Sequence, residues 1–157
     1  MSSPTNSSES LEFSVDAIWS KDKYGKLYTT QLGNNSIGFA CPIPFGGVVD
    51  KISPEEMFLA SIATCTLTTI LHLKDKVRTT LEKLSVSLKS GIIQKENNDY
   101  EFKDINCDII MSGSKDDEFL FERICSLAPK HCLIKKSITK KITYSFTIND
   151  KIYNPVN

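Results

Sequence analysis

The fold is decided by one stretch, residues 53–67, which reads SPEEMFLASIATCTL. Ser53 is a favourable N-cap, Pro54 suits the first helical position, and Glu56 can close a capping box with Ser53. Apolar residues continue well past this start, since eleven of the seventeen residues from 57 to 73 are apolar. The pattern predicts a helix over about residues 54–76 that is buried nearly all round. A partner subunit is the simplest second cover for such a helix.

Three short strands are expected before this helix, at residues 11–19, 27–32 and 36–41. The first is predicted from the alternation of Leu11, Phe13 and Val15 with polar residues. Turn signals at residues 23–26 and 33–35 separate the strands, and a Pro- and Gly-rich loop follows at 42–47.

After the helix the alternation returns. Strands are predicted at residues 84–88 and 100–111, with a bulge at 103–104 where the apolar phase shifts, and at 141–148. An amphipathic helix is predicted at residues 116–128, with an apolar face formed by Phe119, Leu120, Ile124 and Leu127. The order βββ-α-ββ-α-β predicts an α+β fold with antiparallel strands.

Composition bounds the class of protein. A chain of 157 residues predicts a single domain over residues 11–157, preceded by a Ser-rich, disordered tail at residues 1–10. The 19 basic and 19 acidic residues cancel, which argues against a nucleic-acid partner and permits a dimer. Neither a signal peptide nor an apolar run of about 20 residues is apparent, so a cytoplasmic location without membrane insertion is expected.

Five cysteines without a C-x-x-C pair argue against a disulfide framework and against the usual zinc spacings. Cys65 lies in the apolar helix, and Cys132 directly follows the second helix. If the fold brings these two together, they form a dithiol that can cycle through a disulfide. The alternative is that Cys65 is a small core residue and Cys132 a packed loop residue.

The other cysteines, Cys41, Cys107 and Cys125, are interpreted as structural. Because Cys125 is seven residues from Cys132, a disulfide between them is the rival pairing. A metal site from His72, His131 and the cysteines has no supporting ligand spacing, so no metal is expected.

The residues from Ser53 to Ala60, the run Ala63-Thr64-Cys65-Thr66, and Cys132 with Ser137-Ile138 resemble the OsmC/Ohr superfamily of osmotically inducible and organic hydroperoxide resistance proteins. The resemblance extends over residues 11–150 and is closest to a YhfA-like branch. It implies an intertwined homodimer with active sites at the subunit interface. It also implies a peroxidatic Cys65, a resolving Cys132 and a catalytic glutamate at Glu55.

The implied substrates are organic hydroperoxides. The implied reductant is an external dithiol, with no metal or organic cofactor. Ten helical residues, about 15 Å, separate Glu55 from Cys65, so Glu55 would act through the partner subunit; its alternative role is that of a favourable anion in the first helical turn.

The chain departs from the superfamily pattern in two places. Its arginines, Arg78 and Arg123, both follow Cys65, whereas active peroxidases carry an activating arginine in the N-terminal half. Lys21, Lys23 or Lys51 would supply a point charge instead. Leu133 stands where proline usually follows the resolving cysteine. The sequence therefore predicts a thiol-dependent peroxidase, and the alternative is a non-catalytic dimer that binds an apolar ligand or a small thiol.

Overall fold

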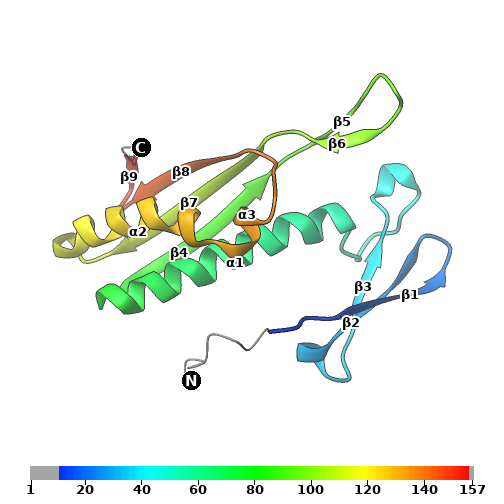
Figure 1. Ribbon diagram of the computed structural model, residues 1–157, viewed down its shortest axis with the longest axis horizontal. Coiled ribbons are helices and arrows are strands. Elements are labelled where there is room, and N and C mark those ends of the chain that lie inside the picture. The colour runs from blue at the N-terminus through cyan, green and yellow to red at the C-terminus, as the bar shows by residue number, and fades with distance from the viewer. Residues whose placement is uncertain (1–10, 156–157) are drawn as a thin grey trace. The chain divides into compact units, whose positions relative to one another are not determined.

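The computed structural model describes residues 11–155. It divides the chain into two compact units, Met1–Met57 and Phe58–Asn157. The predicted tail at residues 1–10 lies outside the described residues, and the single domain over 11–157 stays a prediction. Both units mix strands with helical turns or helices, which confirms the α+β class (Figure 1).

The first unit contains a three-stranded antiparallel sheet with the order β1-β2-β3. Its strands are β1 (Val15–Lys21), β2 (Tyr24–Thr29) and β3 (Ile37–Ala40). The predicted turn at 23–26 was two residues late, because Asp22 adopts a left-handed backbone conformation (φ 47°) and turns the chain there. The Trp19 indole N–H closes this turn by donating to the Asp22 carbonyl at 3.1 Å. Leu11 and Phe13 precede β1 rather than forming part of it.

Helix α1 (Pro54–Val77) begins at the predicted residue and through the predicted capping box. The backbone N–H of Ser53 donates to the Glu56 carboxylate at 2.8 Å, and the backbone N–H of Glu56 donates to the Ser53 hydroxyl at 3.1 Å. The helix ends at Arg78, whose left-handed conformation (φ 56°) breaks the helical path.

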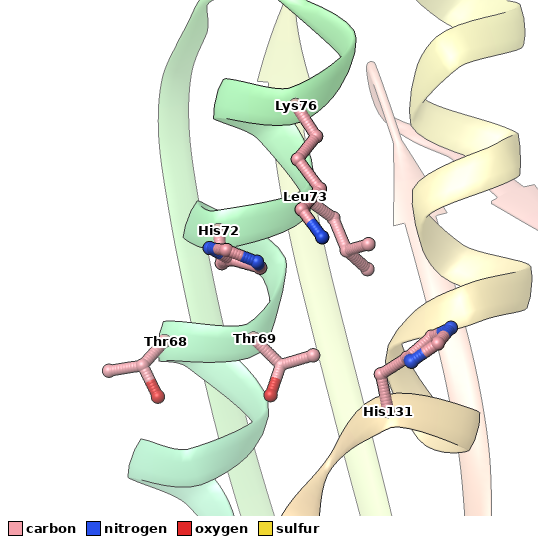
Figure 2. Close-up of a pocket in the computed structure, with 6 residues that line it drawn as sticks. All are labelled: Thr68, Thr69, His72, Leu73, Lys76 and His131. Carbon is pink, nitrogen blue, oxygen red and sulfur yellow. The ribbon is translucent and has the colours of Figure 1, made fainter. Parts of the chain in front are cut away.

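The prediction that α1 is buried nearly all round included cover from a partner subunit, and for that assembly it stays a prediction. Within one chain the buried residues of α1 form one stripe, Ile62, Thr66, Ile70 and Leu73. The opposite face of the second half of the helix is polar and exposed at Thr68 and His72 (Figure 2).

By length and composition α1 is able to cross a membrane, a property that core helices of soluble proteins share.

The second unit contains a four-stranded sheet with the order β4-β7-β8-β9. Its strands are β4 (Leu81–Lys89), β7 (Ile105–Gly113), β8 (Ile142–Ile148) and β9 (Lys151–Tyr153). The predicted antiparallel pairing is confirmed for β4 with β7 and for β8 with β9, whereas β7 and β8 are parallel. The chain between them crosses over through α2 (Glu118–His131) and α3 (Leu133–Lys136), as a parallel pair requires.

Alternate residues of β7, from Ile105 to Met111, face the helices and are buried. They form the core with Ile70 and Leu73 of α1, with Phe146 and Ile148 of β8, and with residues of α2. The predicted face of α2 is confirmed in part: Ile124 is fully buried and Leu127 packs against the core, whereas Phe119 is 66% exposed. The fully buried residues of α2 are Phe121, Ile124, Cys125 and Ala128.

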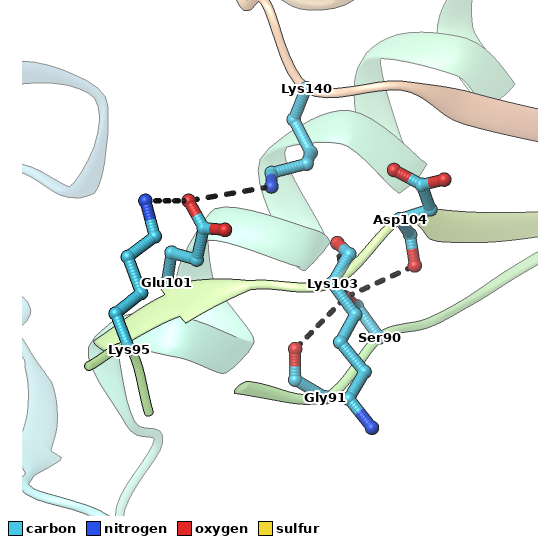
Figure 3. Close-up of polar contacts among 7 residues, drawn as sticks. All are labelled: Ser90, Gly91, Lys95, Glu101, Lys103, Asp104 and Lys140. Atoms are coloured by element: carbon cyan, nitrogen blue, oxygen red, sulfur yellow. Dashed lines mark hydrogen bonds and ion pairs between the residues drawn. The ribbon is translucent and has the colours of Figure 1, made fainter. Parts of the chain in front are cut away.

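The predicted bulge at residues 103–104 is instead a break between two strands. The residues before it form a hairpin of β5 (Ile92–Gln94) with β6 (Tyr100–Phe102). At its base the Ser90 hydroxyl contacts the carbonyl oxygens of Lys103 at 3.0 Å and of Gly91 at 3.3 Å (Figure 3). On the hairpin Glu101 pairs with Lys95 at 2.7 Å and lies 4.0 Å from Lys140.

Candidate functional site

Cys65 and Cys132 meet inside the second unit. Cys65 lies in the middle of α1, and Cys132 occupies the junction at which α2 ends and α3 begins. The hydroxyl of Thr66, the residue after Cys65, donates to the Cys132 sulfur at 3.7 Å. The two thiols are also close enough for Cys65 to influence the ionisation of Cys132. The structure therefore brings together the two cysteines that the sequence singled out.

The backbone of Cys132 is held on both sides. Its N–H donates to the Ala128 carbonyl at 3.0 Å, and its carbonyl accepts from the N–H of Lys136 at 3.2 Å. These two bonds continue the helical pattern across the junction, so the position of Cys132 follows from the end of α2.

The two thiols differ in their surroundings. Cys65 is half-buried, whereas Cys132 is fully buried. Burial is the largest cause that raises the pKa of Cys132, and the neighbouring Cys65 raises it further; the Lys135 backbone N–H and the Thr66 hydroxyl oppose the rise. A reagent arriving from solvent therefore meets Cys65 before Cys132.

Tyr144 of β8 was missed by the sequence analysis. Tyr144 is the register partner of Cys107 in the parallel pair of β7 and β8. Its hydroxyl oxygen is buried and has no hydrogen-bond partner. Burial raises the pKa of Tyr144, the neighbouring thiols Cys107 and Cys132 raise it further, and the nearby Thr66 hydroxyl lowers it slightly. The phenol thus stays protonated at neutral pH. The sequence feature that could have identified Tyr144 is its hydroxyl-bearing ring at a position that alternates with the apolar Phe146 and Ile148, on the inward face of the strand.

All five cysteines are free in the structure, so neither a Cys65–Cys132 nor a Cys125–Cys132 disulfide is formed. Cys125 faces the core, with its sulfur 4.0 Å from that of Met111. Burial raises the pKa of Cys107 to about 12 and that of Cys125 to about 12. Both therefore remain thiols at neutral pH and are poor nucleophiles.

Glu55 and the three lysines considered above belong to the first unit. Glu55 lies in the first turn of α1, and one of its carboxylate oxygens is buried without a hydrogen-bond partner. Lys23 is engaged within the unit, because its ammonium donates to the Phe45 carbonyl at 2.6 Å. The side chain of Lys51 lies against Gly38, and Lys21 is exposed.

A pocket of about 550 Å³ opens between α1 and the end of α2 (Figure 2). Five of its lining residues come from α1 and one, His131, from α2; they are Thr68, Thr69, His72, Leu73, Lys76 and His131. The sequence analysis considered the two histidines as metal ligands without a supporting spacing, and His131 also as a residue for proton transfer. Over residues 11–155 no cluster of three or more metal-binding side chains occurs. The lining combines the polar side chains of two threonines, two histidines and a lysine with the apolar Leu73.

Comparison with known proteins places these features in a family. The sequence model of the family described as OsmC-like protein matches residues 47–147. YmaD of Bacillus subtilis strain 168, itself described as uncharacterized, is 24% identical over 145 residues, which cover 89% of this chain and 95% of YmaD.

Solved structures share the fold. An OsmC-like protein of unknown function from Vibrio cholerae superposes with a TM-score of 0.75 at 17% identity, covering 87% of this chain and 99% of that protein. A Legionella pneumophila protein described as an organic hydroperoxide resistance protein superposes with a TM-score of 0.68 at 19% identity, covering 88% and 96%.

Proposed function

Because the chain belongs to the OsmC-like family, we propose that it is a thiol-dependent peroxidase that reduces organic hydroperoxides through Cys65 and Cys132. The observation that carries the proposal is the proximity of the half-buried Cys65 thiol to the fully buried Cys132 thiol, which is close enough for Cys65 to affect the ionisation of Cys132. A redox dithiol needs this difference in exposure, since one sulfur must be accessible to the substrate and the second must lie within reach of the first to form the disulfide.

The reaction proceeds in three steps. The Cys65 thiolate attacks the distal oxygen of the hydroperoxide, the O–O bond breaks, and the departing alkoxide takes a proton to become an alcohol. Cys132 then attacks the Cys65 sulfenic acid, forming the disulfide and releasing water. An external dithiol reduces the disulfide by exchange and restores both thiols.

The buried oxygen of Glu55 supports a role for this residue as an acceptor. A buried carboxylate oxygen without a partner is costly, so a donor from a substrate or from another subunit would stabilise it. We assign Glu55 to orienting such a donor.

A homodimer in the cytoplasm is part of the proposal. Large apolar side chains of the first unit are exposed, among them Phe13 at 80% and Trp19 at 72%. Contiguous exposed apolar surface is typical of protein interfaces, and a second copy of the chain would cover it.

The test is consumption of cumene hydroperoxide and of hydrogen peroxide with dihydrolipoamide as reductant. We expect turnover that prefers the organic peroxide, that Cys65→Ser abolishes, and that Cys132→Ser stops after oxidation of Cys65. Cys41→Ser is the matched control, because Cys41 lies in the first unit outside the dithiol, and it should keep the wild-type rate. Turnover no faster than that of Cys65→Ser would reject the proposal.

A non-catalytic ligand-binding protein is the second candidate. It is favoured by the absence of an arginine before Cys65 and by the pocket beside α1. Because Lys76 and two histidines line that pocket, a small thiol with a carboxylate fits it better than an apolar ligand. Such a ligand would raise the melting temperature of Cys65→Ser, since a native-state binder stabilises whatever the fate of the thiol.

A further inference from the structure

Five hydroxyl side chains lie on α1 between residues 61 and 69, and one of them behaves differently from the rest. Four donate to backbone carbonyls three or four residues earlier in the same helix: Ser61, Thr64, Thr68 and Thr69. This is the usual local partner of a helical serine or threonine. Thr66 instead donates across the core to the sulfur of Cys132.

The burial of Thr66 strengthens the effect of its hydrogen bond to Cys132. Thr66 is fully buried, as is Cys132, so their hydrogen bond is shielded from water. A hydrogen bond to a group that becomes charged is stronger than one between neutral groups, and more so in a water-poor site. The Thr66 hydroxyl is therefore suited to a Cys132 sulfur that carries negative charge.

Tyr144 supplies a second hydroxyl near Thr66. Its buried oxygen has no hydrogen-bond partner in the resting protein, and the Thr66 hydroxyl is close enough to affect the pKa of the phenol. Donation from the phenol to the Thr66 oxygen would satisfy this buried group. A hydroxyl that accepts one bond donates more strongly to its next partner.

We propose that Thr66 and Tyr144 form a hydroxyl relay that positions Cys132 and stabilises its thiolate, so that a dithiol site without a nearby arginine still has a charge-stabilising group at its buried sulfur. The inference rests on the proposed function of Cys65 and Cys132 as a redox pair. Both members act through Cys132 and are positioning residues.

The relay acts at the two steps in which Cys132 carries charge. During condensation Cys132 loses its proton and forms the S–S bond as the S–O bond of the Cys65 sulfenic acid breaks; the departing hydroxide takes up a proton and leaves as water. During reduction the external thiolate attacks the accessible Cys65 sulfur, and Cys132 leaves as a thiolate. A leaving thiolate that is better stabilised departs faster.

The test uses the reduction step, which does not depend on hydroperoxide. The full chain is oxidised with diamide, the Cys65–Cys132 disulfide is verified by peptide mass spectrometry, and its reduction by dithiothreitol is timed at several pH values. Thr66→Val should slow reduction about tenfold, because one hydrogen bond to a charged group is lost. Thr66→Ser should restore the rate. Tyr144→Phe should slow it about threefold, the effect of one neutral hydrogen bond.

Thr64→Val is the matched control, since it removes a hydroxyl of the same helix that bonds only to helix carbonyls. Its rate should equal that of the wild type, and circular dichroism should confirm that every variant is folded. Equal rates for Thr66→Val and the wild type, or equal slowing by Thr64→Val, would overturn the relay.

The outcomes separate the two proposals. If the disulfide forms but the wild type consumes no hydroperoxide, the peroxidase proposal fails and the rate comparison still decides the relay. If diamide produces no Cys65–Cys132 disulfide in the wild type, the dithiol and the relay fail together.

Discussion

The two units of the chain bury their apolar residues to very different extents. In the second unit Phe121, Ile124 and Phe146 are at most 1% exposed and belong to one continuous core. In the first unit every residue of β1 is exposed, including Ile18 at 56% and Trp19 at 72%, and the one fully buried apolar residue described there is Ala40. The second unit therefore has a continuous apolar core of its own, while the apolar side chains of β1 in the first unit are exposed in the single chain. The candidate dithiol lies in the second unit.

The strongest test of this contrast is a cavity in the core. Phe121→Ala should lower the free energy of unfolding by about 3–5 kcal/mol, because a fully buried aromatic ring is lost. Phe119→Ala on the same helix is the control and should change it by less than about 0.5 kcal/mol, since Phe119 is 66% exposed. Urea denaturation measures both, and similar losses would contradict the assigned buried face of α2.

The next effect concerns the exposed sheet of the first unit. Trp19→Ala should weaken self-association by about 2 kcal/mol, or about thirtyfold in the dimer dissociation constant, if β1 contributes a central interface residue. Sedimentation velocity over a concentration series measures this shift. An unchanged dissociation constant would remove β1 from the interface.

A smaller effect is expected at the capping box that begins α1. Ser53→Ala should cost about 1 kcal/mol, because the N-cap hydroxyl that accepts the Glu56 N–H is lost. Thermal unfolding at neutral pH measures the loss, and a melting temperature equal to that of the wild type would contradict the cap.

The same cap predicts a pH dependence. Hydrogen bonds from the Ser53 backbone N–H, and secondly from its side chain, hold the pKa of Glu56 below its ordinary value of 4.5. A lowered carboxyl pKa stabilises the fold above that value, and the contribution is lost as the pH falls through the lower, folded-state pKa. Glu56→Gln should therefore lose less stability than the wild type between neutral and acidic pH.

The smallest effect has the opposite sign. In the resting, reduced protein Tyr144→Phe should raise the free energy of unfolding slightly, by up to about 1 kcal/mol, because it removes a buried hydroxyl that has no hydrogen-bond partner while Cys132 is uncharged. Slower dithiol chemistry in a more stable protein would indicate that the hydroxyl is retained for function. A loss of stability would mean that Tyr144 already has a good hydrogen-bond partner.

Local signals predicted the parts of the fold that depend on neighbouring residues. The capping box placed the start of α1 at Pro54 because its bonds connect residues three apart. Alternation placed β7 and β8 because a strand with one buried face must repeat every two residues. The pair Cys65 and Cys132 was singled out by the family resemblance, and the fold then brought them together.

The features that sequence reasoning missed depend on pairing across the chain. The parallel register of β7 with β8 is fixed by the crossover through α2 and α3, which no local pattern encodes. Phe119 was wrongly placed on the buried face of α2 because Phe119 and Phe121 are equally apolar, and packing in the core selects Phe121. The roles of Thr66 and Tyr144 arise only when α1, β8 and Cys132 converge.

The threonines that follow Cys65 bear on the local dynamics of α1. The carbonyl oxygen of Cys65 accepts from the hydroxyls of Thr68 at 3.1 Å and Thr69 at 2.7 Å. When a helical carbonyl oxygen also accepts hydrogen bonds from side-chain hydroxyls, its bond with the backbone N–H four residues later is weakened. Helices often bend at such positions. We therefore expect the Thr69 amide proton to exchange with solvent faster than its neighbours in the same helix. Faster exchange at Thr69 would show that the backbone of α1 is least stable at the turn that follows Cys65.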